Sequence, residues 1–172
     1  MQSNNVPSDK MTFLHMVSHI VLAILVLGEI ILAIKLYNKE AIGSIRIIGW
    51  ITLVISGVFG WLPILEFRRK GGVPKKQSFV KTTKLVESGI YAIVRHPQFL
   101  GGILFGLSFI LIAQHWSVLI VGMLVMVFFY IGVIEGDSSA VEKFGDEYKR
   151  YMQEVPRINF VNGIVRLMRK KK

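Results

Sequence analysis

The chain has 172 residues, of which 52% are hydrophobic and only 19% charged, with a mean hydropathy of +0.52 and a formal net charge of +10. Soluble domains carry about 25% charged residues, so this composition argues against a soluble globule and excludes a disordered chain. The chain contains no cysteine, which excludes disulfides, thiolate nucleophiles and cysteine-ligated metal sites. The composition indicates a small membrane protein, which we expect to form one domain over residues 1–172.

Charge-free runs locate the expected membrane spans. Residues 47–65 form a run of 19 without a charge, which is long enough to cross a hydrocarbon core of about 30 Å. Residues 97–134 form a run of 38, which as one helix would reach roughly 57 Å and must therefore fold back on itself. The polar cluster at residues 114–117 marks the turn. We predict an all-α integral membrane fold with four spans, at about residues 12–37, 47–66, 97–113 and 117–135.

The first of these spans is less uniformly apolar than the others, because it contains His15, His19 and Glu29. His15 and His19 have the spacing of metal ligands on a helix, but no third ligand is evident, so we expect packing and no metal site. Glu29 within a span is either a functional residue or an interface residue whose carboxylate reaches toward water.

The basic residues set the expected orientation. Of the 21 Lys and Arg residues, eight lie within residues 66–96 and nine within residues 138–172. With four spans both segments lie on one side, and the positive-inside rule makes that side cytoplasmic. We therefore expect cytoplasmic segments at 67–96 and 136–172, a cytosolic tail at 1–10 and both termini in the cytoplasm. Basic residues that flank spans also argue against nucleic-acid binding, and the expected partners are membrane lipids.

The loop before the third span carries the residues best suited to ligand binding. Arg95 and His96 precede Pro97, and proline is tolerated in the first turn of a helix. A helix N-terminus presents unpaired N–H groups and the positive end of the dipole, which suit a carboxylate or a phosphate. Arg95 adds a fixed charge, and His96 can accept or carry a proton near neutral pH. Tyr91, with an apolar ring and a polar tip, lies just upstream.

Polar residues also stand at the end of the fourth span. Glu135 and Asp137 can hold an ammonium group or ribose hydroxyls, or can cap the following helix. Gly101 in the third span allows close approach of either a second helix or a flat ligand. Apolar residues recur at helical spacing over residues 141–152, which predicts a C-terminal amphipathic helix that lies on the membrane or closes over the loop.

The segments LVESGIYAIVRHPQFLGG and EGDSSAVEKFGDEYKRYMQEVPR, separated by one helical hairpin, resemble the isoprenylcysteine carboxyl methyltransferase family. The broader group includes the phospholipid N-methyltransferases, and the likeness covers roughly residues 68–160. It implies an integral-membrane methyltransferase that binds S-adenosylmethionine between the loop and the last span. The residues that it places at the cofactor are Leu85, Val86, Tyr91, His96, Pro97 and Phe99, with Phe99 standing where the family usually has tyrosine.

The sequence departs from that family at two places. Gly136 and Asp137 stand where the family usually has adjacent glutamates, with Glu135 one step earlier. Gly132 stands where the carboxyl methyltransferases have an arginine that looks like a partner of the substrate carboxylate. The second departure weakens the case for a carboxylate substrate, so the acceptor stays open between a carboxylate, a thiol and a lipid amine.

We predict a methyltransferase for a lipophilic small molecule, with His96, Arg95 and Glu135 as catalytic residues. Gly101, Glu135 and Asp137 join the expected cofactor site. His96 or a carboxylate of the 135–137 cluster would take the proton of an amine acceptor. The alternatives are a membrane reductase of related fold that uses NADPH, and a non-catalytic lipid-binding scaffold. No obligate protein partner is evident.

Overall fold

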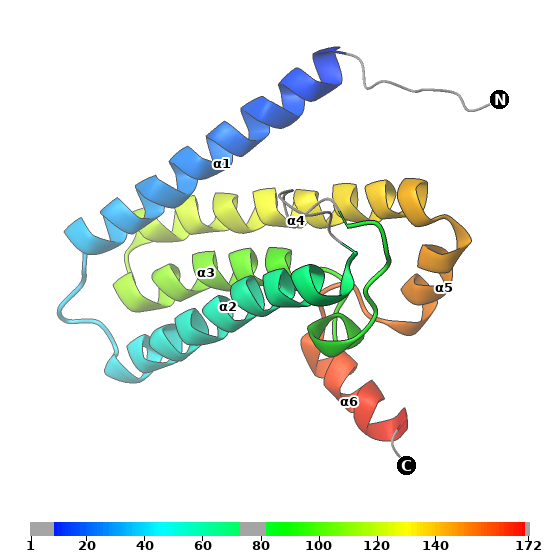
Figure 1. Cartoon of the computed structure of the whole chain (residues 1–172). Helices are drawn as coiled ribbons and strands as arrows, with labels where there is room; N and C mark the ends of the chain where they lie inside the picture. Colours follow the sequence, from blue (N-terminus) through cyan, green and yellow to red (C-terminus); the bar gives the residue numbers. More distant parts are fainter. Residues whose placement is uncertain (1–8, 73–81, 171–172) are drawn as a thin grey trace.

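The computed structural model describes residues 9–72 and 82–170, with side chains from Met16 onward. Residues 1–8 of the expected tail at 1–10 and part of the loop at 67–96 lie outside these ranges, while Asp9 and Lys10 belong to the first helix. The described chain is helical throughout (Figure 1). Its elements in order are α1 (Asp9–Lys35), α2 (Gly43–Lys70), the short 3-10 helix η1 (Gly89–Ala92), α3 (Pro97–Ala113), α4 (Trp116–Phe144), α5 (Asp146–Glu154) and α6 (Phe160–Lys170).

Three of the described helices, α1 from Met16, α2 and α4, are long and apolar enough to cross a membrane. Helix α3 is also apolar but has only 17 residues. Figure 1 shows α2, α3 and α4 running along one another, with α1 slanting away toward the N-terminus. Exposed Ile, Leu and Val side chains cover much of the surface of α1, α2 and α4, as expected for surfaces that face lipid. The helices support an integral all-α membrane protein, while the number of passes and the orientation stay predictions.

The hairpin between α3 and α4 turns where the polar cluster predicted it. Gln114 adopts a left-handed conformation with φ 49°, and His115 caps α4 by accepting a hydrogen bond from the backbone N–H of Ser117 at 3.2 Å. The side-chain amide of Gln114 also binds both backbone groups of Ile42, at 3.1 and 2.9 Å. The turn therefore anchors the connection between α1 and α2 as well.

Two expected boundaries were wrong. Helix α4 does not end near residue 135 but continues to Phe144, and the amphipathic helix expected over 141–152 is divided between the last turn of α4 and α5. Gly145 separates them with φ 58°, a conformation that glycine adopts without a steric penalty. Because α5 folds back, Tyr148 and Tyr151 pack against Leu85 of the loop. The segment therefore closes over the loop.

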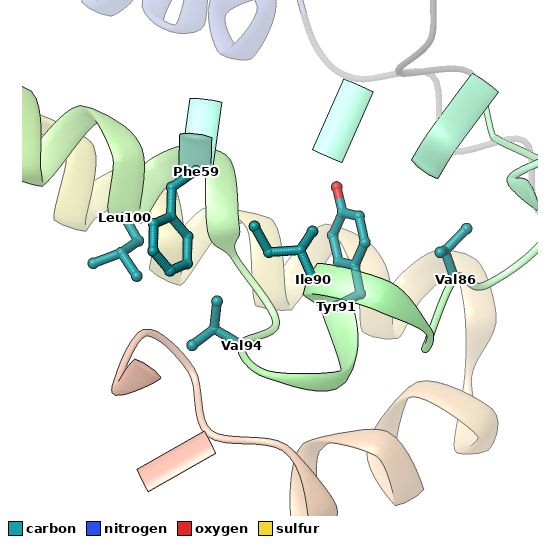
Figure 2. Close-up of a cluster of buried hydrophobic side chains, with 6 residues drawn as sticks. All are labelled: Phe59, Val86, Ile90, Tyr91, Val94 and Leu100. Carbon is teal, nitrogen blue, oxygen red and sulfur yellow. The ribbon is translucent and has the colours of Figure 1, made fainter. Parts of the chain in front are cut away.

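A cluster of buried side chains joins η1 to α2 and α3 (Figure 2). Gly101 allows α3 to approach α2 closely, because a Cβ at position 101 would lie 2.9 Å from the backbone nitrogen of Gly60. The hydroxyl of Ser56 donates a 2.8 Å hydrogen bond to the carbonyl of Gly101. Helices α2 and α3 thus meet backbone to backbone, which fixes the start of α3 beside η1. The buried members of the cluster are Phe59, Val86, Ile90, Tyr91, Val94 and Leu100.

Candidate functional site

A cavity of about 510 Å³ lies at the end of the bundle where α2 and α4 finish and α3 begins, which we call the loop end. Its volume falls in the range of about 300–1,000 Å³ typical of small-molecule sites. The segment before η1, η1 itself, the first turn of α3, the last turns of α4, and α5 all contribute to its walls. The lining includes Phe67, Leu85, Val86, Tyr91, Arg95, His96, Pro97, Phe99, Gly136, Lys143, Tyr148 and Tyr151.

The cavity brings together Arg95 and the six residues that the family resemblance assigned to the cofactor. Three other predicted residues lie elsewhere. Gly101 packs against α2, Asp137 is buried behind the cavity wall, and Glu135 lines a second cavity of about 370 Å³ between α1 and α4. His19, Phe99, Gly136 and Ser139 line both cavities, so the two are neighbours. The binding roles of all these residues stay predictions.

Asp137 organises polar side chains at the cavity wall. Its Oδ1 accepts hydrogen bonds from the Tyr148 hydroxyl and His96 Nε2, both at 2.7 Å. Its Oδ2 accepts from Arg157 Nε at 2.8 Å and from Arg95 Nη2 at 3.3 Å. Asp137 is only 4% exposed, and a buried carboxylate is stable only when its oxygens are paired. Tyr148 and Arg157 were not among the predicted site residues, although both lie in the motif EGDSSAVEKFGDEYKRYMQEVPR.

Arg95 is a buried guanidinium at the cavity wall. Its side chain is 6% exposed, and Asp137 engages only its Nη2 atom. The Nε and Nη1 atoms are buried and have no hydrogen-bond partner among the described residues. Leaving buried donors of a charged group unpaired is costly, and a carboxylate is the ligand whose two oxygens best match the guanidinium fork. Arg95 therefore places an incompletely paired positive charge at the cavity wall.

His96 stands at the N-cap of α3 with its imidazole against α4. Because Nε2 faces the carboxylate of Asp137, we assign the proton of the neutral ring to Nε2, which leaves Nδ1 as an acceptor. A Cβ on Gly136 would lie 2.9 Å from His96 Cε1 and 3.2 Å from Nδ1. Glycine at this position makes room for the imidazole. At Gly132 a Cβ would lie 2.5 Å from Phe99 Cε1, so the Phe99 ring occupies the space beside that second departure.

Tyr91 is held from two sides. Its ring stacks on Phe67 with centroids 4.7 Å apart and planes at 17°, and the Tyr151 hydroxyl donates to its carbonyl at 2.5 Å. In Figure 2 the ring stands off η1 beside Ile90. Burial raises the pKa of Tyr91, Tyr148 and Tyr151 well above the usual range. All three phenols therefore stay protonated at physiological pH and can act as donors.

The described residues include no group of three or more His, Asp or Glu placed to hold a metal ion. The side chain of His15 lies outside the described residues, so packing of the His15–His19 pair stays a prediction.

Comparison with known proteins gives two similarities. The model of a family described as "Protein of unknown function (DUF1295)" matches residues 1–155. A Protein-S-isoprenylcysteine O-methyltransferase of Schizosaccharomyces pombe is 34% identical over 73 residues, which are 42% of this chain and 31% of the relative. The matched region thus spans about a third of that relative's length.

Proposed function

The chain belongs to the family described as "Protein of unknown function (DUF1295)", and we propose that it is an integral-membrane methyltransferase. Its methyl donor is S-adenosylmethionine and its acceptor is a lipophilic small molecule. The yeast relative, which is named as an O-methyltransferase, supports the reaction type. The apolar helices support the membrane location.

Arg95 is the observation on which the proposal rests. S-adenosylmethionine carries an α-carboxylate, and the guanidinium of Arg95, which lines the cavity and is only partly paired by Asp137, would attract it there. The rest of the cofactor is a nucleoside, for which Tyr91 and the apolar side chains of Leu85 and Val86 offer a wall. The residues present therefore fit the cofactor at both its charged and its aromatic parts.

When bound, the cofactor supplies an electrophilic methyl group on a positively charged sulfur. The chain contributes orientation and a dry pocket, which are the main requirements of methyl transfer. His96 Nδ1 takes the proton when the acceptor is an amine or a thiol. Asp137 holds the imidazole through Nε2 and stabilises its protonated form, as an aspartate does for a catalytic histidine. Arg95 acts in binding and positioning.

The second cavity is the proposed place of the acceptor. Its walls are mostly apolar, with Leu22 from α1 and Phe128, Phe129 and Ile131 from α4. It meets the first cavity at Phe99 and Gly136. Its described lining holds Glu135 but no Lys or Arg. This favours an amine or an uncharged acceptor over a carboxylate, for which the described lining offers no lysine or arginine partner.

Calorimetric titration of the purified protein with S-adenosylhomocysteine tests the proposal. We expect Arg95→Gln to weaken this binding about tenfold or more, because a charge-assisted pair is lost. The same variant should bind methylthioadenosine, which lacks the amino-acid carboxylate, as the wild type does. Arg150→Gln is the matched control, since Arg150 is an exposed arginine paired with Glu87.

Failure of the folded wild type to bind S-adenosylhomocysteine would overturn the proposal. Binding of NADPH in its place would favour the reductase alternative, and binding of neither would favour a scaffold. Equal losses of both adenosine ligands in Arg95→Gln would refute the assignment of the carboxylate to Arg95.

A further inference from the structure

Helix α6 presents an apolar stripe that no described part of the protein covers. The opposite side of the helix docks on the protein. A Cβ on Gly163 would collide with the carbonyl oxygen of Ile93, and Arg166 donates to the carbonyl of Ala92. At 100° per residue the stripe is centred about 180° from these docking residues. Its members are Val161, Ile164, Val165 and Met168, which are 58%, 42%, 40% and 67% exposed.

The depth of α6 along the bundle is set by its first residue. Phe160 packs against Phe59 of α2 with ring centroids 5.9 Å apart. Phe59 lies seven residues before Glu66, where the apolar run of α2 ends. At a rise of 1.5 Å per residue this distance is about 10 Å, and amphipathic helices at a membrane surface bury their apolar face by about 5–10 Å.

The surroundings of α6 match a bilayer better than a protein partner. Figure 1 shows α6 leaving the bundle across the direction of α2, α3 and α4, so a membrane crossed by these helices has α6 along its surface. The exposed surface of α2 is apolar too, with Val58 and Trp61 46% and 66% exposed. The C-terminal end of α6 carries Arg169 and Lys170. Lys170 pairs with Glu154 at 2.6 Å but stays 58% exposed, so both basic side chains can complement anionic headgroups.

We propose that α6 lies in the plane of the bilayer interface at the loop end, with the 161/164/165/168 stripe among the lipid acyl chains and the basic end among anionic headgroups. The contacts of α6 with Ala92 and Ile93 then tie η1, and with it Tyr91, to the membrane surface. The bilayer thereby helps to hold the wall of the 510 Å³ cavity. This proposal does not depend on the methyltransferase assignment.

The absence of cysteine from the chain makes a site-specific test direct. Single cysteines are introduced as Met168→Cys on the stripe and Asn162→Cys as the matched control, an exposed residue turned about 120° from it on the same helix. Val58→Cys on α2 is the reference for a lipid-facing position. Each variant is labelled with an environment-sensitive fluorophore and placed in nanodiscs of phosphatidylcholine and phosphatidylglycerol, with and without lipids that carry a quencher on the acyl chain.

We expect the label at position 168 to emit at shorter wavelength than the label at position 162. Acyl-chain quenchers should reduce the emission of the label at position 168 at least about twofold more than that of the label at position 162. The label at position 58 should be quenched as strongly as the label at 168. Equal, water-like emission at 168 and 162 would overturn the proposal. Short-wavelength emission at 168 that lipid quenchers leave unchanged would also overturn it, because protein would then cover the stripe. An unquenched label at 58 would mean that the bundle itself is not embedded, and the proposal would fail with it.

Discussion

Replacing Asp137 by asparagine should destabilise the fold far more than its small change in shape suggests. The substitution is isosteric, so it leaves no cavity, and its effect is electrostatic. It removes the negative charge that two arginines and His96 face. It also replaces one carboxylate oxygen by an amide NH₂ group. That group would face two of the donors whose hydrogen bonds the carboxylate now accepts. Arg95, already without partners at Nε and Nη1, would become an uncompensated buried cation.

Breaking a buried ion pair from one side costs about 3–5 kcal/mol. For a chain of this size each kcal/mol shifts the unfolding midpoint by about 2–4 °C, so we expect Asp137→Asn to lower the midpoint by roughly 6–20 °C. The assay is thermal unfolding in detergent. Asp146→Asn is the matched control, because Asp146 pairs with Lys149 while its side chain is 95% exposed, and a surface pair contributes about 0–1 kcal/mol. Equal midpoints for the two variants would refute the reasoning that Asp137 holds the site together.

Three further predictions use the same unfolding assay. Gly101→Ala should lower the free energy of unfolding by about 1–3 kcal/mol, because the new Cβ meets the α2 backbone. Gly28→Ala is the control and should be neutral, because the new methyl group has open space around it. Equal effects of the two substitutions would contradict the close approach of α2 and α3. Glu29→Met should raise the midpoint, by the equivalent of about 1–3 kcal/mol, because both Glu29 oxygens are buried without a partner among the described residues; a lower midpoint would mean that the carboxylate has a stabilising role. Burial raises the pKa of Tyr151 far above its usual value, so the stability that its neutral phenol contributes is complete below about pH 10 and is lost as the pH rises further. Tyr151→Phe should therefore cost about 1 kcal/mol at neutral pH, through the lost bond to the Tyr91 carbonyl, and should lose less stability than the wild type at alkaline pH; an unchanged alkaline profile would contradict that assignment.

Much of the helical layout could be predicted from residues 47–65 and 97–134, because the absence of charge over a known length is a local property of the chain. The turn at Gln114 was predictable for the same reason. The end of α4 was not. Residues 135–144 are polar enough to suggest a separate segment outside the span. The helix nevertheless continues to Phe144, and Asp137 forms its hydrogen bonds with residues of three other segments.

The candidate site, too, could be predicted from the sequence only in part. Arg95, His96 and Pro97 drew attention because of where they stand relative to a helix start, and the structure puts all three on the cavity wall. The partners of Asp137 could not be inferred, since Arg157 approaches from 20 residues away and Arg95 from 42. Glu135 and Asp137, only two positions apart, face different environments because successive residues on a helix point about 100° apart.

The sequence by itself determined that this chain is a helical membrane protein, where most of its helices lie, and which loop residues line the cavity at the loop end. Those features follow from hydropathy and local backbone preference, which act between near neighbours. Only the tertiary structure decided that Asp137 is a structural hub, that Gly101 serves helix packing, and that Gly136 makes room for His96. These roles depend on which side chains meet after the helices pack, and packing joins segments that the linear sequence keeps far apart.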